Sequence, residues 1–298
     1  MRQLRLRAAH LGPRRRTPAP GRRAMRALLL VALLAGAARA QDLVYGVIPE
    51  TDQLFHRLLA DPRQPQTTVR FYRLGGENLA DVALGNTWGW ARWRIPGAGG
   101  EDWICQLNVA GMGFSRFRLH SLVNEFQTID FFLNVPVEVR RGRFSAQVMA
   151  FHESSHLGDD YIRRTRDTGF RYSIEGVRTV FSYEVRPDVR VYGGGTGVFH
   201  GVPSGQRGAL QYGFEVRSPE LGLSKRHESW VYLAQDFKNY GRSGWNLNSK
   251  TDLGLRVGLP KGARALRVHV GYFGGRSEYG QLHKNREHYW DAGVSFDF

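Results

Sequence analysis

The chain has 298 residues and a formal net charge of +15, with 42 Lys and Arg against 27 Asp and Glu. Residues 1–40 hold ten of the Arg and no Asp or Glu, so the rest of the chain carries only +5 and its charge gives no support for nucleic-acid binding. The single Cys105 excludes an internal disulfide.

Residues 25–40 have the pattern of a secretory signal peptide. Met25 and Arg26 form a charged start, an apolar run follows over residues 27–38, and Ala38-Arg39-Ala40 matches the small-x-small cleavage pattern. The apolar run is too short to cross a bilayer as a stable helix. We therefore expect cleavage before Gln41, with residues 1–24 as an Arg- and Pro-rich N-terminal extension.

Residues 41–65 are expected to form a short helical or irregular periplasmic segment. Within it, the run from Asp61 to Pro65 contains two Pro and favours a turn that fixes how the chain enters the following domain. The segment shows no catalytic pattern.

Residues 66–298 consist of short alternating segments separated by Gly, Pro, Asn and Asp. This pattern predicts an even number of strands, as single-chain bacterial barrels require, and hence an all-β transmembrane antiparallel β-barrel. A soluble antiparallel sandwich is the structural alternative, but it does not account for a signal peptide combined with a C-terminal Phe. The twelve expected strands lie near 66–75, 78–95, 102–117, 122–139, 143–157, 170–185, 188–199, 208–218, 226–237, 243–259, 264–274 and 284–298.

The last strand carries the clearest alternation. His288, Trp290, Ala292, Val294, Phe296 and Phe298 share one face, and Tyr289, Asp291, Gly293, Ser295 and Asp297 share the other. A strand of this kind that ends on Phe298 is typical of bacterial outer-membrane barrels. It indicates the outer membrane as the location and the outer-membrane insertion machinery as a partner.

The predicted loops and the predicted interior fit this architecture. Joints near 140–142, 186–188 and 260–263 are tight, as periplasmic turns are, whereas those at 158–169, 200–207 and 275–283 are longer and polar, as extracellular loops are. Inward positions are expected to fill the barrel with a polar network that includes Gln211, Glu215, Arg256, Arg267 and His269.

The run from Ala150 to Asp160 is the part of the sequence that packing does not explain. Strand alternation places His152, Ser154 and His156 on the lipid-facing side, at the strand end that leads into a long loop. His and Ser two residues apart share one side of a strand, so the imidazole can take the proton of the hydroxyl, as acyl hydrolases require. On the next strand the same face carries Glu175, our candidate for orienting the imidazole, with Ser173 second.

The segment from Phe151 to Ser155 resembles the active-site strand of outer-membrane phospholipase A, and it is similar to that of the lipid A deacylase of the same membrane. The resemblance implies a lipid-ester hydrolase with His152 as base, Ser154 as nucleophile and Glu175 as orienting acid. In the phospholipase pattern Asn-Gly follows the Ser, where this chain has Ser155-His156. Over the whole mature length, the chain more closely resembles an uncharacterised bacterial outer-membrane family, that of domain of unknown function 1207, through residues 58–63 and 152–159.

Several features of such a site stay open at this point. Backbone N–H groups around His156 to Gly158 are expected oxyanion donors, and Asp159 and Asp160 are candidate calcium ligands, although paired acids in a loop also occur simply solvated. Membrane phospholipid or lipid A would be the substrate, and pairing into a homodimer is a property that the resemblance implies. The alternative is a non-enzymatic barrel, either a small channel or a structural protein whose His and Ser cluster binds lipid headgroups.

Overall fold

The computed structural model describes residues 43–46, 53–97, 99–119, 124–205, 208–259 and 264–298. The predicted signal peptide, its cleavage site and the predicted tight joint at 260–263 lie outside these residues. No helix in the described part of the chain is long and apolar enough to cross a membrane.

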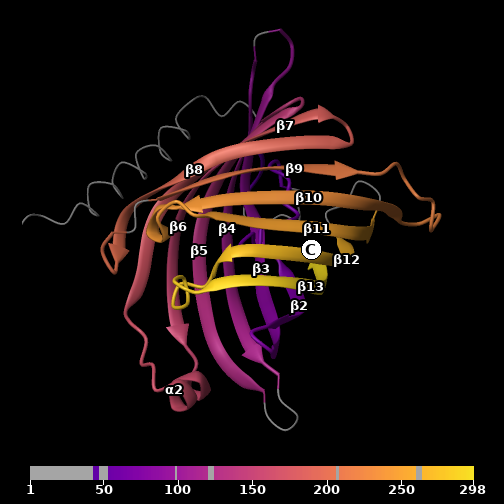
Figure 1. The fold of residues 1–298 in the computed structure, drawn as a ribbon. Helices are drawn as coiled ribbons and strands as arrows, with labels where there is room; N and C mark the ends of the chain where they lie inside the picture. The colour runs from indigo at the N-terminus through magenta and orange to yellow at the C-terminus, as the bar shows by residue number, and fades with distance from the viewer. Residues whose placement is uncertain (1–42, 47–52, 98, 120–123, 206–207, 260–263) are drawn as a thin grey trace, which may run out of the picture.

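Twelve strands form a closed antiparallel barrel, which confirms the predicted fold (Figure 1). Each strand pairs with its neighbours in sequence, and β2 pairs with both β3 and β13, which closes the ring. A short additional strand, β1 (Leu43–Gly46), pairs with β3 near Ala91 to Trp93. The barrel strands are β2 (Thr67–Leu74), β3 (Glu77–Ile95), β4 (Trp103–Arg118), β5 (Glu125–Arg141), β6 (Phe144–Leu157), β7 (Tyr172–Arg186), β8 (Val189–Val202), β9 (Gly208–Arg217), β10 (Glu228–Tyr240), β11 (Leu247–Gly258), β12 (Ala265–Arg276) and β13 (Arg286–Asp297).

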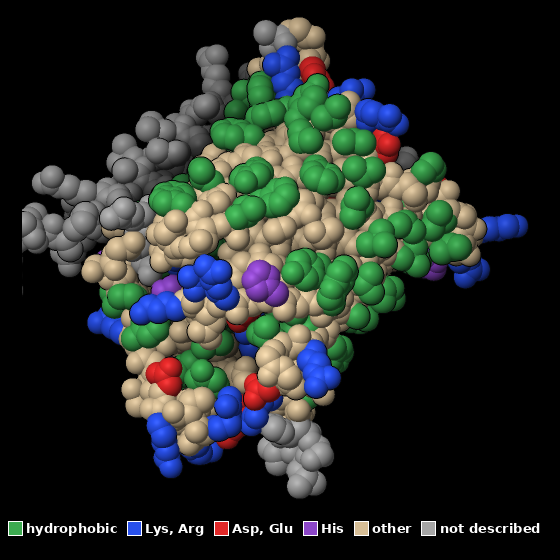
Figure 2. Space-filling view, viewed as in Figure 1, with side chains coloured by type: hydrophobic (Ala, Val, Ile, Leu, Met, Phe, Trp, Pro, Cys, Tyr) green, Lys and Arg blue, Asp and Glu red, His purple; other side chains and the backbone are tan. Residues whose placement is uncertain are grey.

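The outer wall of the barrel is apolar because successive side chains of a strand point to opposite faces. On β13, Trp290 is 73% exposed whereas its neighbour Asp291 is 5% exposed. The outer faces of β5 and β9 carry Phe131, Leu133, Val135, Leu210, Tyr212 and Phe214, all exposed. Figure 2 shows hydrophobic side chains spread over the visible wall, with charged side chains gathered towards its ends. A closed barrel with such a wall is suited to a bilayer, and the fold is that of an outer-membrane barrel.

The interior is filled by paired charges. Arg116 binds both carboxylate oxygens of Glu287, at 2.6 and 3.0 Å, and its Nε donates to Asp81 at 3.1 Å. The ammonium of Lys250 lies 2.7 Å from Asp252 and 2.6 Å from Asp291. Buried charges persist when they are paired in this way. The polar interior expected from the sequence is therefore present.

Residues 53–66, which we call the plug, pack inside the lumen. Phe55 and Leu58 are completely buried, and the carboxylate of Glu138 on β5 accepts the backbone N–H groups of Leu54 and Phe55 at 2.9 and 3.1 Å. From β8, Arg190 donates to the carbonyl of His56 at 2.7 Å. The sequence predicts a separate periplasmic segment here, whereas the structure places these residues among the inward-facing side chains of the barrel wall.

The connections fall at two ends of the barrel. The short turns after β5 and β7 lie at the end that also holds the C-terminus, which we call the terminal end. The opposite loop end holds the longer connections 158–171, 203–207 and 277–285, together with α2 (Asp159–Thr165) and η1 (Gly241–Ser243) (Figure 1). Some connections depart from the rule: the β2–β3 turn at the loop end is tight, and the β3–β4 connection and residues 218–227 at the terminal end are long.

Candidate active site

The outer face of β6 becomes polar as the strand approaches the loop end. Val148 is an exposed apolar side chain, whereas His152 and His156, further along the same face, are exposed and Ser154 between them is half-buried. The alternate residues Glu153 and Ser155 point inward and are buried. The structure therefore places His152 and Ser154 together on the membrane-facing side of the wall.

Strand β7 brings Glu175 beside His152. The two strands are antiparallel and in a register that pairs His152 with Glu175 and Ser154 with Ser173. His152 Nδ1 lies 3.6 Å from Glu175 Oε1, and the two side chains are 47% and 41% exposed. The carboxylate can thus hold the imidazole by its Nδ1 edge, which leaves Nε2 for another partner.

Ser154 lies on β6, which pairs with β5 on one side and β7 on the other. Its register partners are Phe131 on β5 and Ser173 on β7. Within the described residues, Ser154 Oγ has no hydrogen bond to His152. Catalytic hydrogen bonds are often long before substrate binds, so the relative position of the two residues on one strand face is the observation that matters.

One of the expected oxyanion donors, the N–H of Gly158, is already engaged. The N–H of Gly158 donates to the carbonyl of Gln127 at 2.9 Å, and His156 is paired with Ile129 in the β5–β6 ladder. The N–H of Gly158 is therefore not free to receive an oxyanion in this arrangement, and the expectation for the other N–H groups stays a prediction.

Asp159 and Asp160 form the first turn of α2. The carboxylate of Asp160 accepts a hydrogen bond from Arg163 at 3.1 Å. Within the described residues, neither Asp is grouped with two further His, Cys, Asp or Glu ligands at metal-binding distances. Calcium prefers six to eight oxygen ligands, so the two residues do not form a fitting calcium site by themselves.

The inner face of β6 is anchored to the loop between β12 and β13. Ser155 Oγ accepts the backbone N–H of Gln281 at 2.9 Å, and the Gln281 side chain donates to the Ser155 carbonyl at 2.9 Å. In the same loop, the N–H of Gly280 donates to Asp130 on β5 at 3.1 Å. These contacts fix the strand end that carries His152 and Ser154.

One cluster of possible metal ligands within the described residues was not anticipated. Asp252, His269 and Asp291 are buried inside the barrel, with ligand atoms within 4.8 Å of one another. The ammonium of Lys250 lies between the two carboxylates and provides the positive charge that they require. The cluster therefore acts as part of the interior ion-pair network.

Several solved structures are similar to this barrel. The Salmonella typhi outer membrane phospholipase dimer with bound calcium is 12% identical, with a TM-score of 0.49 over 83% of this chain and 94% of that chain. Outer membrane phospholipase A from Escherichia coli is 11% identical, with a TM-score of 0.48 over 82% of this chain and 99% of that one. The KdgM porin is 9% identical, with a TM-score of 0.40 over 78% of this chain and 99% of that one.

No curated protein matches the sequence. The family model described as "Protein of unknown function (DUF1207)" matches residues 2–298, which is nearly the whole chain. The predicted family is thereby confirmed: this outer-membrane barrel belongs to the DUF1207 family.

Proposed function

We propose that this barrel is a serine hydrolase of membrane-lipid esters. The observation that carries the proposal is the outward-facing pair of His152 and Glu175, 3.6 Å apart, on the same wall as Ser154. A structural barrel gains little from three polar side chains on this face, whereas acyl transfer requires a nucleophile, a base and a group that orients the base.

In the proposed mechanism each residue has one role. Glu175 holds the imidazole of His152 so that Nε2 is free to accept a proton. His152 takes the proton of Ser154, whose oxygen attacks the ester carbonyl and forms an acyl-enzyme, and His152 then gives that proton to the departing alcohol. Water, deprotonated by His152, attacks the acyl-enzyme and releases the fatty acid.

The position of these residues sets the class of substrate. The side chains face the bilayer near the loop end, so a lipid can bring its ester to Ser154 without leaving the membrane. The tight turns after β5 and β7 lie at the terminal end, as periplasmic turns do, which puts the site on the outer-leaflet side of the barrel. Phospholipid and lipid A both present esters there.

The filled lumen favours this function over the channel alternative. Phe55 and Leu58 of the plug are buried against the wall, and paired charges occupy the surrounding interior. A non-enzymatic, headgroup-binding barrel remains the second outcome of the following experiment.

Fatty-acid release from phospholipid and from lipid A, by purified protein in mixed micelles, tests the proposal. We expect release by the wild type and a loss of at least about 100-fold in Ser154→Ala and in His152→Asn. Ser155→Ala is the matched control, because this neighbouring hydroxyl faces the interior. Equal release by wild type and Ser154→Ala, or none from either lipid, would refute the enzyme and leave the headgroup-binding barrel.

A further inference from the structure

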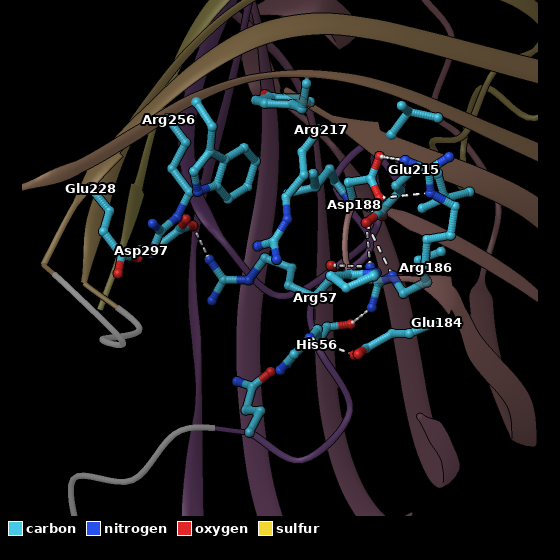
Figure 3. A pocket seen from close by; sticks show the side chains of 18 of the residues that line it. His56, Arg57, Glu184, Arg186, Asp188, Glu215, Arg217, Glu228, Arg256 and Asp297 are labelled. Atoms are coloured by element: carbon cyan, nitrogen blue, oxygen red, sulfur yellow. Dashed lines mark hydrogen bonds and ion pairs between the residues drawn. The ribbon is translucent and has the colours of Figure 1, made fainter. Parts of the chain in front are cut away.

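A cavity of about 400 Å³ opens at the terminal end of the barrel, away from the outer wall (Figure 3). Its floor is the plug, and its sides are the ends of β7 to β11 and β13. This volume is in the range of small-molecule sites. Five Arg line it, namely Arg57, Arg186, Arg190, Arg217 and Arg256.

Most of the carboxylates in this cavity are already engaged by Arg side chains. Arg190 binds Glu215 at 2.6 Å, and Arg186 binds Asp188 at 3.1 Å. Arg57 is paired with Asp297, a carboxylate that Arg267 also binds at 2.9 Å.

Arg217 differs from these residues. Within the described part of the chain, no carboxylate lies at ion-pair distance from its guanidinium. Its Cζ lies 5.6 Å from the ring centroid of Trp230, and Arg256 lies 5.3 Å from the same ring. In Figure 3 the side chains of Arg57, Arg217 and Arg256 extend into the cavity from the plug, β9 and β11. The cavity therefore holds three Arg side chains, and two of them, Arg217 and Arg256, lie beside the ring of Trp230.

The plug residue His56 lies beside Arg140 and Arg190. Desolvation, with Arg190 and Arg140 as lesser causes, lowers the pKa of His56 to about 4, against the opposing effect of Glu184. The imidazole is therefore neutral at physiological pH and adds no further positive charge, but its nitrogens remain able to hydrogen-bond.

We propose that this cavity is a binding site for a phosphate-bearing ligand, with Arg217 as the principal anion contact and Trp230 as an apolar wall. A guanidinium without a carboxylate partner offers a fork of N–H donors that matches two phosphate oxygens. Arg57 and Arg256 contribute further positive charge. The phosphate can belong to a lipid headgroup at the membrane edge or to a soluble phosphate ester. The site is separate from the hydrolase proposal and does not depend on it.

Isothermal titration of the detergent-solubilised full-length protein tests this site, with glycerol 3-phosphate, short-chain phosphatidylglycerol and acetate as probes. If the site recognises the phosphate group alone, we expect both phosphate probes to bind more tightly than acetate. If it also requires the lipid part of the ligand, we expect only phosphatidylglycerol to do so. Arg217→Gln should weaken binding at least about tenfold, because it removes a charge-assisted contact, and Arg217→Lys should restore part of it.

The control is Arg163→Gln on α2 at the opposite end of the barrel, whose guanidinium is 74% exposed and paired with Asp160. We expect this variant to bind within about twofold of wild type. A change in gel mobility between unheated and heated samples verifies that each variant is folded. Failure of both phosphate probes to bind, equal binding of acetate, or unchanged affinity in folded Arg217→Gln would overturn the proposal.

Discussion

Replacing Asp61 with Asn should loosen the plug without altering its shape. Asp61 is 3% exposed, and its carboxylate binds Lys238 at 2.5 Å and Arg178 at 3.2 Å. It also accepts the side-chain amide of Gln211 at 3.0 Å. Asn keeps an oxygen acceptor but removes the charge, so two buried cations lose their common partner.

The expected cost follows from what those cations retain. Breaking a buried ion pair by removing one member costs about 3–5 kcal/mol. Lys238 keeps Glu278 at 3.5 Å and Asp236 at 3.8 Å, whereas Arg178 keeps, among the described residues, its hydrogen bonds to Gln211. We therefore expect the low end, about 3 kcal/mol, which shifts the equilibrium between docked and released plug by about 100-fold.

Trypsin provides the assay, because Arg57 and Arg63 are cleavage sites within the plug and both are tied to the wall. Arg57 pairs with Asp297, and Arg63 pairs with Asp130. When cleavage is slower than redocking, its rate follows the open population, so cleavage after Arg57 or Arg63 should be about 100-fold faster in Asp61→Asn. The matched control is Asp160→Asn on the exposed helix α2. Unchanged cleavage in a folded Asp61→Asn barrel would refute the role given to this carboxylate.

Three further predictions concern pH, the acidic loop and the orienting acid. Burial raises the pKa of Asp61 and of Glu278, but Lys238 and other cations hold both pKa values below their ordinary range. The stability that these groups provide is therefore present above about pH 4 and is lost as the pH falls through the lowered pKa values. Pepsin cleavage of the plug should rise only below about pH 4, and a comparable loosening between pH 7 and 5, seen by hydrogen exchange, would contradict this. Asp159→Asn and Asp160→Asn should leave hydrolysis within about twofold of wild type both with and without added calcium, because Asp160 is engaged by Arg163 and no third ligand joins the pair in the described residues. Glu175→Gln should lower kcat about 100-fold with little change in KM, since Glu175 acts through His152, and a change in KM alone would count against that role.

Strand alternation was sufficient to predict the barrel because it is a local property of the sequence. β13 was expected over 284–298 and spans Arg286–Asp297, with its apolar and polar faces as predicted. The same alternation assigned His152 and Ser154 to the outer face of β6, where the structure places them.

The sequence of strand β8 shows no clear division into two faces, and the structure gives the reason. Four Gly between residues 193 and 197 remove the side-chain pattern, and the pairing with β7 shifts between Glu175 and Gly176. Val198 and His200 therefore pair with adjacent residues of β7, Gly176 and Glu175. A bulge of this kind breaks the period of two and leaves no local signal.

The plug could not be predicted because its contacts are remote in sequence. Asp61 and Lys238 are 177 residues apart, and Leu54 and Glu138 are 84 apart. Residues 53–66 have no helical or strand period that would identify a buried face. The loss of Gly158 as an oxyanion donor has a similar origin, since only the fold shows that its N–H is taken by Gln127.

Covalent labelling of Ser154 is the most direct test of the hydrolase. A long-chain alkyl sulfonyl fluoride in micelles reacts with a serine that a base has activated, and mass spectrometry locates the adduct. We predict one adduct, on the peptide that carries Ser154, lost in His152→Asn and retained in Ser155→Ala. A folded wild-type barrel that forms no adduct there, or forms it equally without His152, would contradict the proposed function.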